Sequence, residues 1–394
     1  MKSNWQTKKL HEICDFYSGL WTGKKPPYVE VGVIRNTNFT KEGKLDDSNI
    51  AFIKVEKKQF EKRKLKYGDI ILEKSGGGPK QPVGRVVLFN KKTGDFSFSN
   101  FTSVIRVKKS DQIDFNYLHR YLFSFYISGT TETMQSNSTG IRNLDLNKYK
   151  EIGISFPVLT EQKRIVKLLD EVSAKTAKAQ ENTEKNLQNS KELFESYLRD
   201  VFANPGNDWG KKTLGETCDF FNGKAHEKFI DEDGNYIVVN SKFVSSEGNT
   251  YKRTKKQLSP LFEGDIVMVM SDVPNGRALA KCFLIDKDDT YSLNQRICAI
   301  RSKVFENKFL YYQLNRNKHF LSFDNGENQT NLRKNDILNC LLLVPSISEQ
   351  KAIVKKINAL LENTKKVSGN YGHKLSNLGE FKKSILKMAF NNSL

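Results

Sequence analysis

Apolar and small residues recur at steps of three and four along two long stretches of the chain. In the first stretch the series begins at Ile165 and Leu169 and ends at Val201, and in the second it begins at Ile353 and ends at Ile385. Heptad-like spacing over several turns predicts a helix with the narrow apolar seam of a coiled coil. At 1.5 Å per residue, about 42 residues give a rod of roughly 60 Å. Because a lone helix would expose its seam, we expect the two helices to pack together.

Polar residues and glycines mark the start and the middle of these helices. Thr160 and Ser348 are candidate N-caps, and each is followed by a glutamate that the helix dipole favours. Gly369, Gly372 and Gly379 lie inside the second helix, where a glycine costs about 1 kcal/mol relative to alanine. We expect these glycines either to allow another backbone to approach closely or to mark a break.

The remainder of the chain predicts short strands separated by turns, so the predicted fold class is α+β. Each half contains four predicted strands followed by one helix. In the first half the strands are 28–35, 68–74, 84–90 and 102–107, and the helix is 114–128. In the second half the strands are 236–240, 264–271, 277–285 and 296–301, and the helix is 307–321.

An internal repeat covers nearly the whole chain. The segment that starts at Trp5 recurs at an offset of 204, the Gly-Asp-Ile segment at Gly68 recurs at 196, and the segment from Pro157 onward recurs at 188. The offset stays at 188 along the helix, because an insertion there would rotate the seam. The predicted segments are a first domain (1–156), a first long helix (157–204), a second domain (205–344) and a second long helix (345–394).

Composition narrows the class of protein. The 394 residues carry 64 Lys and Arg against 45 Asp and Glu, a net charge of +19, which favours a polyanionic partner. Charge alone is also typical of lysine-rich proteins that bind no nucleic acid. No apolar run approaches the 18 residues of a membrane span, and no export signal is visible. The five cysteines include no CxxC pair, so we expect no disulfide framework and a reducing, cytoplasmic location.

No pattern typical of a catalytic site is present. The glycine-rich stretch 75–80 lacks P-loop spacing, because Gln81 stands where the second glycine is required. Asp69 and Glu73 lack the spacing of nuclease carboxylates, and we expect Asp69 in a turn that enters a strand. The five histidines do not lie at metal-ligand spacing from the cysteines. We therefore predict a non-catalytic chain without metal ligands.

Basic and amide side chains on loops are the candidate DNA contacts. Arginine pairs with guanine, and asparagine or glutamine with adenine, in the major groove. The two copies agree in their scaffold and differ in these loops, as expected if each reads a different base sequence. Each residue could equally belong to an ordinary polar loop. The candidates are Lys74, Ser75, Gly76, Gly77, Lys80, Arg85, Thr139, Arg142, Asn143, Ser271, Asn275, Arg277, Asn328, Gln329, Asn331 and Arg333.

This layout resembles the specificity subunit of type I restriction–modification systems over the full chain. The strongest motif is P-x-x-x-E-Q-K-x-I-V at Pro157 and Pro345. The resemblance implies two target-recognition domains separated by two long helices that form an antiparallel coiled coil, with an internal pseudo-twofold repeat. The other matching residues are Trp5, Leu10, Glu12, Trp209, Leu214, Glu216, Gly68 and Gly264.

The resemblance also implies a mechanism and partners. Each recognition domain would bind one half of a bipartite double-stranded DNA target, and the helices would set the spacer. The subunit would assemble with two methyltransferase subunits, which flip an adenine out of the duplex, and with two restriction–translocase subunits. S-adenosylmethionine, ATP and Mg²⁺ would belong to those partners, which leaves this chain without a cofactor.

We expect the flanks of the coiled coil, including Glu161, Gln162, Glu349 and Gln350, to help dock the methyltransferases. The alternative is that these four residues only cap the helices. Two other functions stay open: the specificity subunit of another modification system or a stand-alone DNA-binding protein, and a coiled-coil scaffold whose basic charge is incidental.

Overall fold

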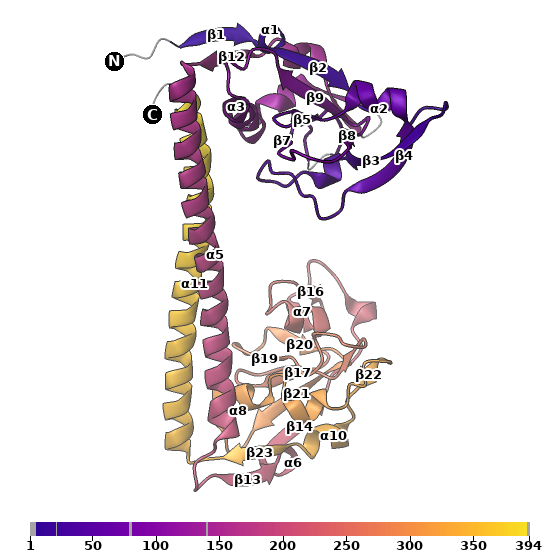
Figure 1. Cartoon of the computed structure of the whole chain (residues 1–394). Helices are drawn as coiled ribbons and strands as arrows, with labels where there is room; N and C mark the ends of the chain where they lie inside the picture. The colour runs from indigo at the N-terminus through magenta and orange to yellow at the C-terminus, as the bar shows by residue number, and fades with distance from the viewer. Residues whose placement is uncertain (1–4, 21, 79–80, 139–140, 392–394) are drawn as a thin grey trace. The chain divides into compact units, whose positions relative to one another are not determined.

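The computed structural model describes residues 5–20, 22–78, 81–138 and 141–391. The chain divides into two compact units, Met1–Glu184 with Gly372–Leu394, and Lys185–Tyr371. Each unit contains one predicted domain and the adjoining parts of both long helices (Figure 1). The end of the chain therefore belongs to the same unit as its beginning.

A four-stranded antiparallel sheet forms the centre of the first domain, in the order β2-β9-β5-β7. A second sheet, β4-β3-β8, shares a buried apolar cluster with it, and a third, β10-β11-β6, carries several candidate residues. The strands are β1 (Gln6–Lys9), β2 (Cys14–Ser18), β3 (Tyr28–Ile34), β4 (Ala51–Glu56), β5 (Ile70–Glu73), β6 (Ser75–Gly77), β7 (Val86–Leu88), β8 (Phe96–Phe98), β9 (Thr102–Val107), β10 (Gln135–Ser138), β11 (Ile141–Leu144) and β12 (Gly153–Phe156), which pairs with β1. The helices are α1 (Leu10–Ile13), α2 (Lys57–Arg63), α3 (Phe115–Ile127) and α4 (Leu146–Lys150).

The second domain repeats this topology, with a central sheet in the order β14-β21-β17-β19 and a second sheet in the order β16-β15-β20. A two-stranded pair, β18-β22, takes the place of the third sheet. The strands are β13 (Gly210–Thr213), β14 (Cys218–Asn222), β15 (Tyr236–Val239), β16 (Lys252–Thr254), β17 (Ile266–Val269), β18 (Ser271–Asp272), β19 (Cys282–Leu284), β20 (Tyr291–Leu293), β21 (Ile297–Ser302), β22 (Thr330–Asn331) and β23 (Leu341–Val344), which pairs with β13. The helices are α6 (Leu214–Thr217), α7 (Ser241–Ser245), α8 (Asn307–Leu314), α9 (Lys318–Leu321) and α10 (Lys334–Leu338).

The α+β fold class is confirmed, and most predicted elements lie where they were expected. Strand 102–107 is β9, and helix 114–128 is α3 with one residue fewer at each end. The predicted helix 307–321 is instead two helices, α8 and α9. It breaks because Arg316, between them, has a φ of +57°, which no helical residue adopts.

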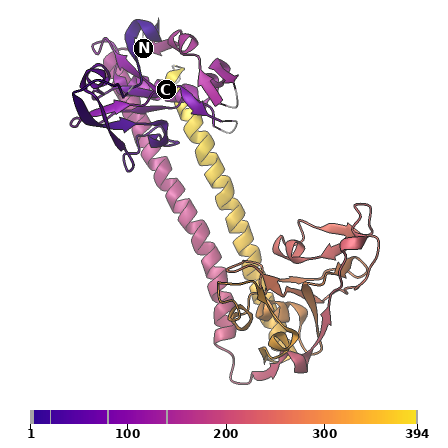
Figure 2. The same cartoon turned by 90° about the vertical axis from the view of Figure 1, so that its right-hand side faces the viewer.

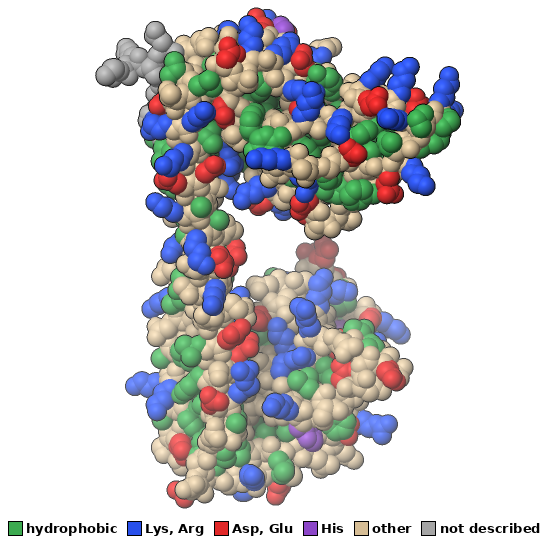
Figure 3. All heavy atoms as spheres, viewed as in Figure 1, with side chains coloured by type: hydrophobic (Ala, Val, Ile, Leu, Met, Phe, Trp, Pro, Cys, Tyr) green, Lys and Arg blue, Asp and Glu red, His purple; other side chains and the backbone are tan. Residues whose placement is uncertain are grey.

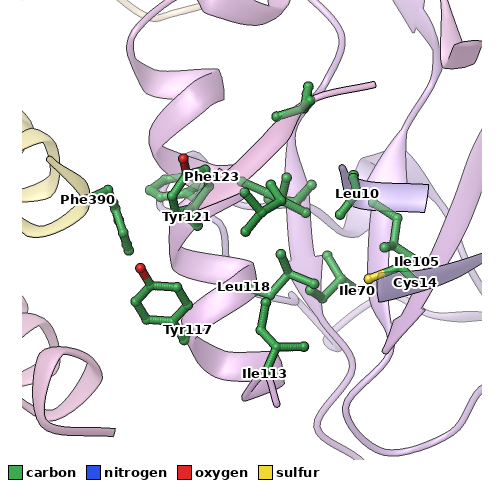
Figure 4. Close-up of a cluster of buried hydrophobic side chains, with 14 of the residues drawn as sticks. Leu10, Cys14, Ile70, Ile105, Ile113, Tyr117, Leu118, Tyr121, Phe123 and Phe390 are labelled. Carbon is green, nitrogen blue, oxygen red and sulfur yellow. The ribbon is translucent and has the colours of Figure 1, made fainter. Parts of the chain in front are cut away.

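Aromatic residues fix the far end of each long helix to a domain. In the first unit, the Phe390 ring lies 5.4 Å from Tyr117 and 5.0 Å from Tyr121, both on α3 (Figure 4). In the second unit, Phe202 lies 5.5 Å from Phe309 on α8. Phe202 and Phe309 occupy the repeat positions of Phe390 and Tyr117, so the two contacts are equivalent.

The long helices α5 (Leu159–Ala203) and α11 (Ile347–Phe390) form the predicted antiparallel coiled coil. The start of α5 lies beside the end of α11 in the first unit, and the end of α5 lies beside the start of α11 in the second (Figure 2). The predicted seam positions of α5 are all buried or half-buried. Thr183, a polar residue of the seam, is 1% exposed, and its hydroxyl donates to the Ala179 carbonyl over 2.7 Å. The seam is therefore closed without an unpaired hydroxyl at this point.

Two predictions about the helix details are wrong. The helices begin at Leu159 and Ile347, one residue before the expected caps, and Ser346 accepts from the Glu349 amide over 3.3 Å. The three glycines of α11 neither break the helix nor admit a neighbouring backbone. Among the described residues, no atom other than the helix's own adjacent backbone lies within 4 Å of a Cβ built on any of them.

Replacing Gly372 and Gly379 with alanine should therefore stabilise the chain. Each substitution gains about 1 kcal/mol of helix propensity and meets no steric obstacle. The double variant should unfold several degrees higher in a thermal scan followed by circular dichroism. Gly264→Ala is the contrasting variant, because its φ is +89° and its new Cβ would lie 2.2 Å from Asn307. It should lower the unfolding temperature; a double variant that also lowers it would contradict the assignment of an open helix face.

Candidate nucleic-acid interface

Two strands distant in sequence bring the first set of candidate residues together. β6 pairs antiparallel with β11 and places Ser75 opposite Asn143. The Ser75 hydroxyl donates to Asn143 Oδ1 over 2.5 Å. Alternate residues of a strand face opposite sides, and Leu144 is buried, so Asn143 and Ile141 face away from the core. The first hairpin surface comprises residues 74–77 and 141–143.

The second unit repeats this arrangement. β18 pairs antiparallel with β22 and places Ser271 opposite Asn331. The Gln329 side-chain amide donates to Ser271 Oγ over 2.8 Å and more weakly to Asn331 Oδ1 over 3.4 Å. Ser271 and Asn331 occupy the repeat positions of Ser75 and Asn143, at the offsets of the surrounding scaffold. The second hairpin surface comprises residues 271–277 and 328–331, with Arg333 just beyond.

The candidates of the first hairpin surface differ in their surroundings. Lys74 is half-buried beside β6, and Gly76 has a φ of +99°, a conformation that favours glycine. A Cβ on the buried Gly77 would lie 2.6 Å from the Gln81 carbonyl oxygen, so this position requires glycine. The Arg142 guanidinium lies 3.7 Å from the Glu132 carboxylate. Lys80 and Thr139 lie outside the described residues.

The candidates of the second hairpin surface are mostly exposed. Asn275 has a φ of +55°, which asparagine tolerates, and its side chain donates to the Gly326 carbonyl over 3.3 Å. The Arg333 backbone amide donates to Asp336 Oδ2 at the start of α10. The exposed candidates are Asn275, Arg277, Asn328, Gln329, Asn331 and Arg333.

Arg85 does not belong with these residues, and its prediction as a DNA contact does not fit its position. Its side chain is buried and forms a two-pronged ion pair with Glu73, at 2.7 and 2.9 Å. It also donates to the carbonyl of Phe39 over 3.0 Å. Burial alone would lower the pKa of Arg85, but the bonds and charge of Glu73 outweigh it and raise that pKa. Arg85 is therefore part of the core.

The repeat partner of Arg85 has the opposite environment. Arg277 is exposed, and Glu73 is replaced by Val269 in the second copy. Among the described residues, Arg277 has no hydrogen-bonding or ion-pair partner. The same Gly-Arg pattern thus gives a structural arginine in one domain and an available one in the other.

Asp69 takes the role predicted for it, in the turn that enters β5. Its carboxylate accepts from the Lys66 amide over 2.7 Å and pairs with Arg106 at 2.6 and 2.7 Å. Asp265 and Arg301 form the equivalent pair in the second domain, at 2.7 and 2.9 Å. The pair belongs to the common scaffold and not to a catalytic cluster.

Two of the four predicted docking residues are buried and hold the fold instead. The Gln162 and Gln350 side chains are each 0% exposed. Gln162 joins the start of α5 to the segment before α3, and Gln350 joins the start of α11 to Glu306 ahead of α8. Neither amide can face a partner, so their prediction as docking residues does not fit the structure.

The two glutamates next to them face solvent at least in part. Glu161 pairs with Arg164 at 2.7 Å, and hydrogen bonds from that guanidinium hold the pKa of the carboxyl below its usual value. Glu349 accepts from the indole of Trp209 over 2.8 Å. Glu161 is half-buried and Glu349 is exposed, and each lies in the first turn of a long helix.

A polar pocket of about 360 Å³ adjoins the second hairpin surface. Its lining includes Asn240, Lys242, Gln295 and Arg296. The backbone carbonyl of Arg296 accepts from the Met270 amide over 3.2 Å, which places this loop directly beside β18. The sequence patterns did not single out this loop. The signal available was an Asn-Gln-Arg run at residues 294–296, at the start of the predicted strand 296–301.

Positive charge is distributed over both units. On the face that Figure 3 shows, Lys and Arg side chains cover both domains and the helices, without gathering in one patch. No helix within the described parts of the chain is long and apolar enough to span a membrane.

The chain thus consists of two tandem domains with equivalent polar strand pairs, and each domain is fixed to parts of both long helices. The family described as the type I restriction modification DNA specificity domain matches residues 2–189 and 206–368. The chain therefore belongs to the specificity-subunit family of type I restriction–modification systems.

Curated relatives carry the same description. The StySPI specificity subunit of Salmonella potsdam is 23% identical over 433 residues, which cover 100% of this chain and 90% of that one. The MjaVIII specificity subunit of Methanocaldococcus jannaschii is 25% identical over 269 residues, 61% of this chain and 63% of the relative. That match spans a little under two thirds of the relative's length.

Solved structures show the same fold. A chain from a study of complex assembly and conformational transition of the type I R-M system has a TM-score of 0.79 at 18% identity, covering 99% of this chain and 98% of that one. The HsdS subunit from Thermoanaerobacter tengcongensis has a TM-score of 0.68 at 18% identity, covering 99% and 97%.

Replacing Arg85 with alanine should destabilise the first domain strongly. It would leave the Glu73 carboxylate buried without its partner, which costs about 3–5 kcal/mol. Arg277→Ala, at the exposed repeat position, should leave the urea midpoint unchanged. Glu73→Gln combined with Arg85→Met should recover most of the loss, since it removes both charges. Equal midpoints for the two arginine variants would contradict this assignment.

Gln162→Ala and Gln350→Ala should each loosen the attachment of a long helix to its domain. Each substitution leaves buried backbone groups without hydrogen-bonding partners, which lowers the free energy of unfolding by about 1–3 kcal/mol. Faster amide hydrogen exchange at the start of α5 or α11 would report the loss. Glu161→Ala, next to Gln162 but facing solvent, should leave exchange unchanged.

Proposed function

We propose that each domain binds one half of a bipartite double-stranded DNA target through its hairpin surface. The observation that carries this proposal is the occurrence of one Ser–Asn strand pair in both domains, surrounded by side chains that differ between the copies. Two domains with the same backbone arrangement but different polar side chains can recognise different base sequences. The net charge of +19 supplies attraction to phosphates, which is independent of sequence.

In this proposal the coiled coil sets the distance between the two half-sites. A helix is a regular rod, so its length fixes a spacing that loops could not hold. The constant offset of 188 along both helices supports this role, because only the domains vary in length.

The chain also acts as the assembly platform of a larger complex. We assign docking of two methyltransferase subunits to the exposed flanks of the coiled coil, including Glu161 and Glu349, whose carboxylates lie at the surface. The chain itself carries no active site in this proposal. Two restriction–translocase subunits complete the assembly, and S-adenosylmethionine, ATP and Mg²⁺ are bound by the partner subunits.

Lengthening both helices tests the spacing role. Seven residues inserted after Glu184 and seven after Tyr371 keep the seam in register and lengthen each helix by about 10 Å. At 3.4 Å per base pair, the spacer should grow by about three base pairs. The readout is methylome sequencing of cells that express the chain with its methyltransferase subunit, in which the half-sites should stay unchanged.

Insertion of two residues at both places is the matched control. Each residue of a helix turns by about 100°, so two residues move the seam off its face and should abolish methylation. The proposal would be contradicted if the unaltered chain directed methylation to a continuous, non-bipartite motif. It would also be contradicted if the spacer were unchanged after the seven-residue insertion.

A further inference from the structure

The two hairpin surfaces share one backbone frame, which allows their side chains to be compared position by position. The Lys74 amide donates to the Phe101 carbonyl over 3.0 Å, and the Met270 amide donates to the Arg296 carbonyl over 3.2 Å. Lys74 and Met270 are repeat partners, so Phe101 and Arg296 occupy equivalent positions. Each residue stands immediately before the second strand in the order of its central sheet, β9 or β21.

A second pair of positions is fixed in the same way. The Leu144 amide donates to the Lys74 carbonyl over 2.8 Å, and the Leu332 amide donates to the Met270 carbonyl over 2.8 Å. Three residues before these leucines stand Ile141 in the first domain and Gln329 in the second. The equivalent positions therefore hold Phe and Ile in one domain, and Arg and Gln in the other.

Two large apolar side chains are exposed on the first hairpin surface and directly next to it. Phe101 is 46% exposed and Ile141 is 48% exposed. The Phe101 ring lies 3.7 Å from where a Cβ of Gly76 would stand, so it covers the glycine of β6. Both apolar side chains are therefore available to contact a partner beside polar Ser75 and Asn143.

Hydrogen-bonding side chains occupy the same two positions on and next to the second hairpin surface. Arg296 is exposed and lines the polar pocket, and within the described residues its guanidinium has no hydrogen-bonding or ion-pair partner. Gln329 is exposed, and its bond to Ser271 Oγ fixes the orientation of its amide. Its carbonyl oxygen, and the amide hydrogen that reaches Asn331 Oδ1 only weakly at 3.4 Å, can pair with a planar partner that offers both a donor and an acceptor.

We propose that the two domains read their half-sites by different chemistry at equivalent positions. Phe101 and Ile141 contact the C5-methyl group of thymine in the first half-site, because that methyl is the one apolar group of the major groove. In the second half-site Arg296 pairs with O6 and N7 of a guanine, and Gln329 pairs with N6 and N7 of an adenine. This inference rests on the proposed binding of DNA by the hairpin surfaces and adds the base class that each side chain recognises.

Base analogues in the target test the assignment. The full chain, assembled with its methyltransferase subunits, is titrated against fluorescent duplexes that carry the bipartite target found by methylome sequencing. Deoxyuridine replaces each thymine of the first half-site in turn and removes only the methyl group. At one thymine or more, wild-type affinity should fall roughly fourfold. Phe101→Ala together with Ile141→Ala should bind more weakly and should no longer distinguish thymine from uracil there.

The second half-site is scanned with 7-deazaguanine and 7-deazaadenine, which lack only the N7 acceptor. Wild-type affinity should fall roughly tenfold at one guanine and at one adenine. Arg296→Ala should lose the response to 7-deazaguanine and keep the response to 7-deazaadenine, and Gln329→Ala should do the reverse. Changes in one domain should leave the response of the other half-site intact.

Phe52→Ala and Lys308→Ala are matched controls, since both residues are exposed and lie in the same two domains outside the hairpin surfaces. Both variants should keep every analogue response. The inference would be overturned if binding were sequence-selective but insensitive to all of these analogues. It would also be overturned if Phe101→Ala weakened binding equally with thymine and with uracil. Either result would leave the proposed function standing. Absence of any sequence-selective binding would overturn the proposed function as well.

Discussion

A buried glutamine side chain at the start of each long helix fixes how that helix is attached to its domain. Gln162 Nε2 donates to the carbonyls of Gln112 and Pro157, each over 2.8 Å, and its Oε1 accepts from the Asp114 amide over 2.8 Å. One side chain thus joins the first turn of α5 to the cap of α3, and Gln350 does the same in the second unit. A tilt of the helix would leave several buried polar atoms unpaired, so the direction in which the helix leaves its domain is fixed.

Comparison of the two copies separates what holds the fold from what is free to vary. The Asp69–Arg106 pair recurs as Asp265–Arg301, and two of the three bonds of Gln162 recur at Gln350. The Glu73–Arg85 pair does not recur. Interactions present in both copies are therefore the scaffold, while the surroundings of the Ser–Asn strand pairs are the part that changes between them.

The sequence predicts the fold well because its strongest signals are local. The helix seam is predicted by the heptad-like spacing, and the constant offset is seen directly in the internal repeat. Short apolar patterns predict β9 and α3. The hairpin surfaces are harder, because the pairing of β6 with β11 joins glycine-rich and polar segments far apart in the chain. The role of Arg85 depends on its partner and not on its motif, so the shared Gly-Arg pattern suggests one function for two residues with opposite environments. Gln162 and Gln350 lie in a strong motif, but only the structure reveals that they face inward.

The docking of Phe390 and Phe202 has a consequence for the origin of the chain. Each domain packs against the far end of the helix that belongs to the other half. A helix of 45 residues is about 68 Å long, so a half-chain could not bring the end of its helix back to its own domain. An ancestral half would have completed its core only by exchanging helix ends with a second copy. Under the proposed function, such a symmetric dimer would read only inverted repeats of a single half-site. Fusion of the two copies into one polypeptide would then free each hairpin surface to diverge, and the target would no longer need to be symmetric.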